Sequence, residues 1–239
     1  MNKDSSQQAY SLIKFFTEEE HYKSFLEGTN LFRTPHYYRK CEDTGRGDRH
    51  ESCIYNWDEN TGRPKPKFNH PDIKDSFKSV LIYPANEQKD SWIQSWAIIG
   101  NVNGFENSFE QLQEEFGRFF VLLPFNKIEA YKRLLEKASG LKVNCCALGY
   151  SDDPTKRSLT VKDSKFSYQK EFRFFIGECG KDELKDKWLE TPKIKKLLMD
   201  AKSIKLTSPN GVIRYYTVGG SKVVTSIPTY AKHLTQGKM

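Results

Sequence analysis

The chain has 239 residues and a net charge of +7, and 37% of its residues are hydrophobic, including 16 Phe and 12 Tyr. This length can bury a full hydrophobic core, so we expect one domain over 1–239. Five cysteines, two of them the adjacent Cys145 and Cys146, argue against a disulfide framework and favour a reducing, cytoplasmic location. No segment approaches the roughly 18 apolar residues of a membrane span, and no apolar signal core is present near residue 1.

Three elements are predicted before residue 40. They are a strand at 12–16, a helix at 18–27 that ends at Gly28, and a strand at 30–34 that Pro35 interrupts. Residues 42–76 are rich in Gly, Pro, Asp and Asn, and this long polar loop is of the kind that usually serves function or is disordered.

The remaining two thirds of the chain alternate irregularly between strands and helices. Gly140 is placed to cap the second of three helices, which carries Ile128, Tyr131, Leu134 and Leu135 on one face. Because no repeating βα unit is visible, we expect an α+β fold with mixed, mainly antiparallel sheets and flanking helices. The predicted strands are 77–83, 92–99, 118–123, 141–149, 166–176, 203–207, 212–218 and 222–227, and the predicted helices are 107–117, 126–138 and a lysine-rich 182–201.

Segment 168–175, with the sequence YQKEFRFF, is the strongest candidate for chemistry. In a strand, Phe172 and Phe174 would face the core, while Gln169 and Glu171 would lie about 7 Å apart on the other face. The plainer interpretation is a solvated strand face on which Glu171 pairs with a neighbouring cation.

Several segments taken together resemble a known family. The stretch 31–51 (LFRTPHYYRKCEDTGRGDRHE) and the segment FSYQKEFRF are similar to bacterial and phage proteins related to the ADP-ribosyltransferase toxins of anti-phage systems. The resemblance covers most of the chain loosely. It implies an ADP-ribosyltransferase-like fold, NAD as co-substrate without a metal, and a nucleobase acceptor, in RNA more than in DNA. A protein acceptor is the near alternative within the same class. The resemblance also implies a cognate antitoxin as a possible partner.

The resemblance assigns roles to individual residues. Glu171 would stabilise the positive charge that develops on the ribose when the nicotinamide bond breaks, and Gln169 would orient the acceptor. Arg33 would bind the diphosphate, and Tyr37 or Tyr38 would stack on nicotinamide. The Ser-Thr-Ser triplet of arginine-specific members is missing; Ser95 is the nearest substitute, and His36 could take the histidine role of the diphtheria-toxin class.

Other interpretations stay open. His36, Cys41, His50 and Cys53 could form a zinc site, although their spacing matches no familiar finger. Asp48 and Glu51, with Glu42 and Asp43 nearby, could hold magnesium in a nuclease or order the loop over NAD.

A non-catalytic module that binds nucleic acid or a partner protein is the alternative outside enzymology. The net charge of +7 favours polyanionic partners. The lysines of segment 182–201, together with Lys202 and Lys205, are where a phosphate backbone would be expected to lie, while Trp188, Ile194, Leu197 and Leu198 would form a core stripe. Neither a Walker A lysine loop nor a GxGxxG motif occurs in the chain.

Overall fold

The fold was analysed in a computed structural model that describes residues 11–41, 47–53, 55–67, 77–83, 89–100, 105–207, 211–220 and 223–226. It is α+β, with mainly antiparallel sheets and a few helices, as the sequence predicts. None of the described helices is long and apolar enough to cross a membrane.

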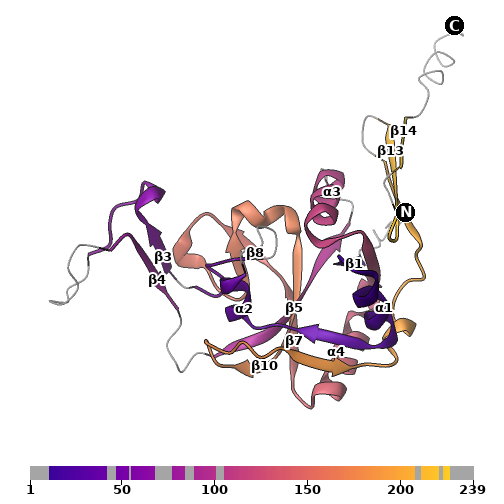
Figure 1. Ribbon diagram of the computed structural model, residues 1–239, viewed down its shortest axis with the longest axis horizontal. Coiled ribbons are helices and arrows are strands. Elements are labelled where there is room, and N and C mark those ends of the chain that lie inside the picture. Colours follow the sequence, from indigo (N-terminus) through magenta and orange to yellow (C-terminus); the bar gives the residue numbers. More distant parts are fainter. Residues whose placement is uncertain are drawn as a thin grey trace, which may run out of the picture.

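A five-stranded antiparallel sheet forms the centre of the molecule (Figure 1). Its strand order means that the central strand β5 has a neighbour from the beginning of the chain on one side and a neighbour from much later on the other. In spatial order the strands are β6 (Phe119–Pro124), β1 (Ser11–Phe16), β5 (Asp90–Ile99), β10 (Glu171–Cys179) and β7 (Val143–Ala147).

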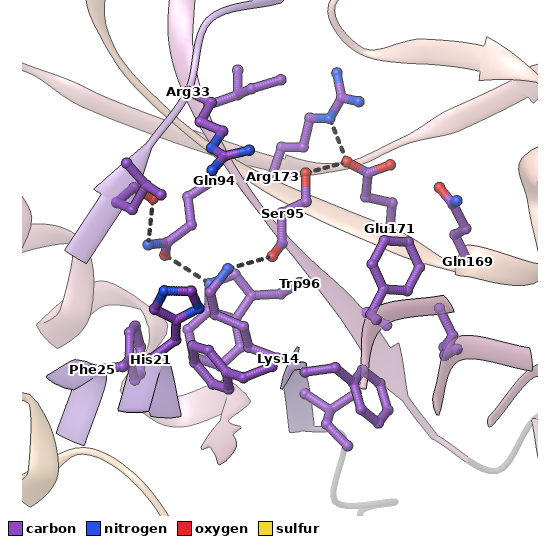
Figure 2. Close-up of a pocket in the computed structure, with 18 of the residues that line it drawn as sticks. Lys14, His21, Phe25, Arg33, Gln94, Ser95, Trp96, Gln169, Glu171 and Arg173 are labelled. Atoms are coloured by element: carbon purple, nitrogen blue, oxygen red, sulfur yellow. Dashed lines mark hydrogen bonds and ion pairs between the residues drawn. The ribbon is translucent and has the colours of Figure 1, made fainter. Parts of the chain in front are cut away.

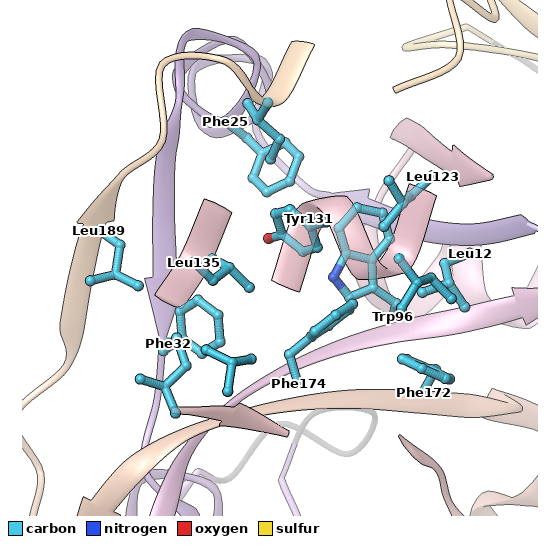
Figure 3. Packing of buried hydrophobic residues seen from close by; sticks show 14 of the residues in the cluster. Leu12, Phe25, Phe32, Trp96, Leu123, Tyr131, Leu135, Phe172, Phe174 and Leu189 are labelled. Carbon is cyan, nitrogen blue, oxygen red and sulfur yellow. The ribbon is translucent and has the colours of Figure 1, made fainter. Parts of the chain in front are cut away.

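Each face of this sheet has its own hydrophobic core, because alternate residues of a strand point to opposite faces. Phe172 and Phe174 of β10 pack with Trp96 in the larger core (Figure 3), which helices α1 (Glu19–Glu27) and α4 (Ile128–Ser139) cover. The smaller core lies on the other face beneath α3 (Phe105–Phe116). Its members are Ile13, Ala97, Phe109, Leu112, Phe120, Leu122 and Tyr216.

The central sheet is split between β1 and β5. These strands pair only from Ser11–Ile13 to Ala97–Ile99, whereas β1 continues beside β6 to Phe16. Further along the same edge of β5, Arg33 forms an isolated bridge with Ile93. The stretch of β5 between these two contacts therefore has no neighbouring strand on that side among the described residues.

Smaller elements surround the sheet. A ribbon of β2 (Thr29–Phe32) and β11 (Lys187–Glu190) leads into the short helix α2 (Pro35–Lys40). Two further pairs are β3 (Tyr55–Asp58) with β4 (Ser79–Ile82), and β8 (Gly149–Ser151) with β9 (Val161–Asp163) in parallel. A three-stranded sheet of β12 (Ser203–Thr207), β13 (Val212–Thr217) and β14 (Val223–Ser226) packs on α3 through Tyr216. The 3-10 helices are Glu59–Thr61, Phe125–Lys127, Pro154–Lys156, Ser164–Gln169 and Ile194–Lys196.

Most predicted elements are present within a residue or two, but the helix predicted over 182–201 is wrong. The segment contains β11 and only a 3-10 turn at Ile194–Lys196, because Pro192 would clash with the preceding turn of a helix and removes a backbone donor. As a consequence, Leu189 is buried in the core, and Trp188, predicted to be core, is 59% exposed.

Three other predictions are corrected. The strand predicted at 166–176 begins only at Glu171, since Ser164–Gln169 form a 3-10 helix. Pro35 does not merely interrupt a strand: Thr34 caps α2 by accepting a hydrogen bond from the Tyr37 amide, and Pro35 occupies its first turn. The loop predicted at 42–76 contains β3, while 42–46 and 68–76 lie outside the described residues.

Candidate active site

A cavity of about 470 Å³ lies in the split of the central sheet. Lys14 of β1 and Ser95 of β5 line it from the two sides of the split, and the Nζ of Lys14 donates a hydrogen bond to the Ser95 carbonyl at 3.2 Å (Figure 2). The volume falls in the range of small-molecule sites. Its further polar lining includes His21, Arg33, Tyr38, Glu51, Gln94, Lys162, Gln169, Glu171 and Arg173.

Glu171 is held on both of its carboxylate oxygens. It is 4% exposed, and its Oε1 accepts hydrogen bonds from the Ser95 hydroxyl and from Nε of Arg173, the latter at 2.5 Å. Its Oε2 accepts from Nζ of Lys162 at 3.0 Å, and its backbone amide donates to the Tyr150 hydroxyl at 2.8 Å. Both carboxylate oxygens are therefore fixed, and Figure 2 shows the carboxylate beside Ser95 and Arg173.

The charges around Glu171 keep it ionised. Burial opposes ionisation, but the cations of Arg173 and Lys162 outweigh burial and lower the pKa of Glu171 to about 2. The Arg173 guanidinium is itself 1% exposed and donates to both carboxylate oxygens of Glu51, at 2.5 and 2.8 Å. The network thus contains two buried cations and two buried carboxylates, so its formal charges cancel.

Gln169 faces the same cavity as Glu171, but not for the predicted reason. It ends the 3-10 helix, and Lys170 then adopts a left-handed conformation, with φ of 45°, before β10 begins. The Gln169 Oε1 accepts from Nζ of Lys162 at 3.1 Å, while its Nε2 donates to the Tyr168 hydroxyl at 3.3 Å. Lys162 therefore bridges Gln169 and Glu171 directly.

A buried arginine fixes the strand that carries Lys162. Arg157 is 5% exposed, and its guanidinium donates to the Lys162 carbonyl at 2.7 Å, to the Asp163 carboxylate at 2.7 Å and to the Ser151 carbonyl. These contacts tie β8 and β9 together around one cation. Lys162 is consequently held by its backbone on one side and by Glu171 on the other.

The residues predicted to bind a cofactor divide into two groups. Arg33, Tyr38 and Ser95 line the cavity together with Gln169 and Glu171, whereas His36 and Tyr37 are not among the lining residues. Tyr37 instead contacts the side of Arg33, whose guanidinium carbon lies 3.9 Å from its ring centroid. A cation–π contact with the Tyr37 ring therefore stabilises the position of the Arg33 guanidinium.

The plainer interpretation of this strand face is wrong about its exposure, because Glu171, Arg173 and Phe175 are all buried. Its other half is confirmed, since Glu171 forms ion pairs with Lys162 and Arg173. Burial of this charged face is possible because Ser95, Glu51 and Lys162 supply its partners.

The predicted zinc and magnesium sites are not formed in the described part of the chain, which contains no group of three or more His, Cys, Asp or Glu side chains arranged to hold an ion. Glu51 is engaged by Arg173, and Asp48 accepts a hydrogen bond from the His50 amide at 3.0 Å. The Cys53 thiol donates to the Tyr55 carbonyl at 2.6 Å. Glu42 and Asp43 lie outside the described residues.

Sequence reasoning missed Lys162 and the role of Arg173. The contact of Arg173 with Glu171 could have been predicted, because the two residues are two positions apart and a strand places their opposite charges on one face. The contact of Lys162 with Glu171 could not have been predicted, because it depends on the left-handed turn at Lys170 and on the position of β9.

Comparison with known proteins gives no relative: no family model, curated protein or solved structure matches the chain.

Proposed function

We propose that the protein is an NAD-dependent ADP-ribosyltransferase, with Glu171 as its catalytic carboxylate, that modifies a nucleobase in RNA as a toxin in defence against phage. One observation carries the enzymatic part: a buried, ionised carboxylate is fixed by Ser95 inside a cavity that also contains Arg33. The finer assignment to an ADP-ribosyltransferase-like fold is part of this proposal and rests on the resemblance of segments 31–51 and FSYQKEFRF.

The chemistry requires a fixed negative charge next to the ribose. When the bond between ribose and nicotinamide breaks, its electron pair leaves with nicotinamide, which becomes neutral, and positive charge develops on the ribose. A preorganised carboxylate such as Glu171 stabilises that charge without reorganising. The acceptor then forms a bond to the ribose carbon and loses a proton to solvent.

Two further side chains suit binding of the substrates. Arg33 is held against Tyr37, and its guanidinium suits a bidentate contact with the diphosphate of NAD. Gln169 has its amide orientation set by Lys162 and Tyr168 and can orient the acceptor. Tyr38 lines the same cavity and offers an aromatic surface to nicotinamide.

The test is incubation of the purified protein with NAD labelled in its adenylate part and with total RNA, DNA or protein. We expect label to enter RNA and free nicotinamide to appear, and Glu171→Gln to reduce both by about 100-fold or more. Glu178→Gln is the matched control, because Glu178 lies on the same strand but is exposed and paired with Lys89.

Because Glu171→Gln leaves Lys162 without a carboxylate partner and takes one of two from Arg173, it could unfold the chain, so Ser95→Ala serves as a second variant. It removes one hydrogen bond to Glu171 and leaves both ion pairs intact, so the fold should survive while activity falls about 10-fold. Absence of nicotinamide release from folded wild-type protein with every acceptor would refute the enzymatic proposal.

A non-catalytic nucleic-acid-binding role is the second candidate, and one observation favours it. Both oxygens of Glu171 are already paired with cations, as in a purely structural ion-pair network. The same experiment separates the two roles, because a binding module would retain RNA without consuming NAD.

A further inference from the structure

One large aromatic side chain lies at the rim of the cavity. Trp188 of β11 is 59% exposed, while its neighbour Leu189 is 7% exposed and packs in the larger core. The ribbon is buried on one face and open on the other, so Trp188 is on the open side. Trp188 also lines the cavity that contains Glu171.

The open face of the ribbon leads from Trp188 towards Arg33. Trp188 pairs with Leu31, and Thr29, Leu31 and Arg33, each two residues apart, all line the cavity. Residues two apart in a strand are separated by about 7 Å on one face. An apolar platform of Trp188 and Leu31 is thus followed, one strand period further in, by a guanidinium.

This platform is rigid. The Asn30 side chain donates to the Thr191 hydroxyl at 2.6 Å and accepts from Tyr131 of α4 at 2.6 Å, which ties one end of the ribbon to the core. Arg33 is held by its bridge to Ile93 and by the Tyr37 ring. Its Nε is buried and lies 3.8 Å from the Asp186 carboxylate. The Arg33 side chain as a whole is 28% exposed, so the rest of the guanidinium is accessible to a ligand.

We infer that Trp188 and Leu31 form a stacking subsite for an unpaired base of single-stranded nucleic acid, and that Arg33 binds the adjoining phosphate in the absence of NAD, whose diphosphate takes the same guanidinium. Aromatic side chains beside cationic groups are the general means of binding single strands. The openness of Trp188 suits a polymer that extends past the rim, and the net charge of +7 suits a polyanion. That the stacked strand is the acceptor of the reaction rests on the proposed function. That single-stranded nucleic acid binds at Trp188 does not.

Tryptophan fluorescence tests it without any catalytic step. Trp57 and Trp96 are buried and Trp92 is half-buried, so quenching by a stacked base reports mainly on Trp188. We expect a short single-stranded RNA to quench the emission, and an abasic strand of equal length and charge to quench much less. Trp188→Ala should weaken RNA binding, measured by anisotropy, by about 10-fold, and Trp188→Phe should largely restore it.

Tyr215→Ala is the control, because Tyr215 is an exposed aromatic on β13 that is not among the residues lining the cavity. Equal weakening by Tyr215→Ala and Trp188→Ala, or equal binding of the abasic strand, would overturn the inference. So would quenching by NAD alone that is lost in Trp188→Ala, since Trp188 and not Trp96, which also lines the cavity, would then hold a base of the co-substrate. RNA stacking on Trp188 without any nicotinamide release would uphold the subsite and refute only the proposed enzyme.

Discussion

At the scale of single residues, the ion pairs around Glu171 decide what it can do. Ser95, Arg173 and Lys162 contact its carboxylate from β5, β10 and β9. Tyr150 binds its backbone amide, and Glu51 neutralises the far side of Arg173. A carboxylate with this many donors is preorganised, which is the property that electrostatic catalysis requires.

We expect Lys162→Met to raise the pKa of Glu171 from about 2 towards its ordinary range. Burial raises this pKa and the cations of Arg173 and Lys162 lower it, so removing one cation leaves burial less opposed. Carbon-13 NMR of the Glu171 carboxyl measures the change, and Lys162→Arg should preserve the low value. An unchanged pKa in Lys162→Met would contradict the role of Lys162 as the bridging cation.

The same lowered pKa predicts a loss of stability in acid. Glu171 has a folded pKa below its unfolded one, so its stabilising contribution is complete above about pH 4.5 and is lost as the pH falls towards about 2. Urea unfolding of wild type should therefore decline more steeply between pH 5 and 3 than that of Glu171→Gln. His50, whose pKa burial and nearby cations lower to about 4, contributes equally to both proteins and cancels in the difference. Parallel declines would contradict the prediction.

At the scale of elements, the sequence predicted those helix and strand ends that a residue's own conformational preference determines. Gly28 ends α1 with φ of 123°, and a Cβ there would lie 2.8 Å from the Thr191 backbone. The prediction that this helix ends at Gly28 is therefore confirmed. The start of β10 could not be predicted, because the left-handed Lys170 is a non-glycine residue and follows from tertiary contacts. Gln169 and Glu171 nevertheless converge, since Lys162 bridges them.

The segment 47–53 is coupled to β10 by one ion pair, and breaking it should destabilise the fold. Glu51→Gln leaves the Arg173 guanidinium, 1% exposed, short of one of its two negative partners. Loss of one partner of a buried ion pair costs about 3–5 kcal/mol of unfolding free energy. Denaturant unfolding measures this, and Glu59→Gln, at an exposed position after β3, should cost little. Equal effects of the two variants would show that segment 47–53 is not held by Arg173.

At the scale of the whole molecule, the sequence predicted the class of fold but not the split in its central sheet. Length, glycine positions and irregular alternation were enough for α+β. The split depends on β1 leaving β5 after Ile13 and on Arg33 rejoining the same edge at Ile93, which are contacts between residues some 80 and 60 positions apart. No local pattern contains such contacts, so the cavity and its full lining follow only from the assembled sheet.

The salt dependence of nucleic-acid binding can locate the path of the phosphate backbone. If one phosphate binds Arg33 at the end of the ribbon, Arg33→Gln should lower the slope of log affinity against log salt concentration by about 0.7, the value for one contact with a single strand. The sequence instead predicted that the phosphate backbone lies along the lysines of segment 182–201, Lys202 and Lys205. Lys205 lies on the separate C-terminal sheet. Anisotropy titrations of single-stranded RNA at several salt concentrations compare Arg33→Gln with Lys205→Gln and with Lys78→Gln, an exposed control preceding β4. A slope that changes only with Lys205→Gln would place the strand on the C-terminal sheet and away from the cavity.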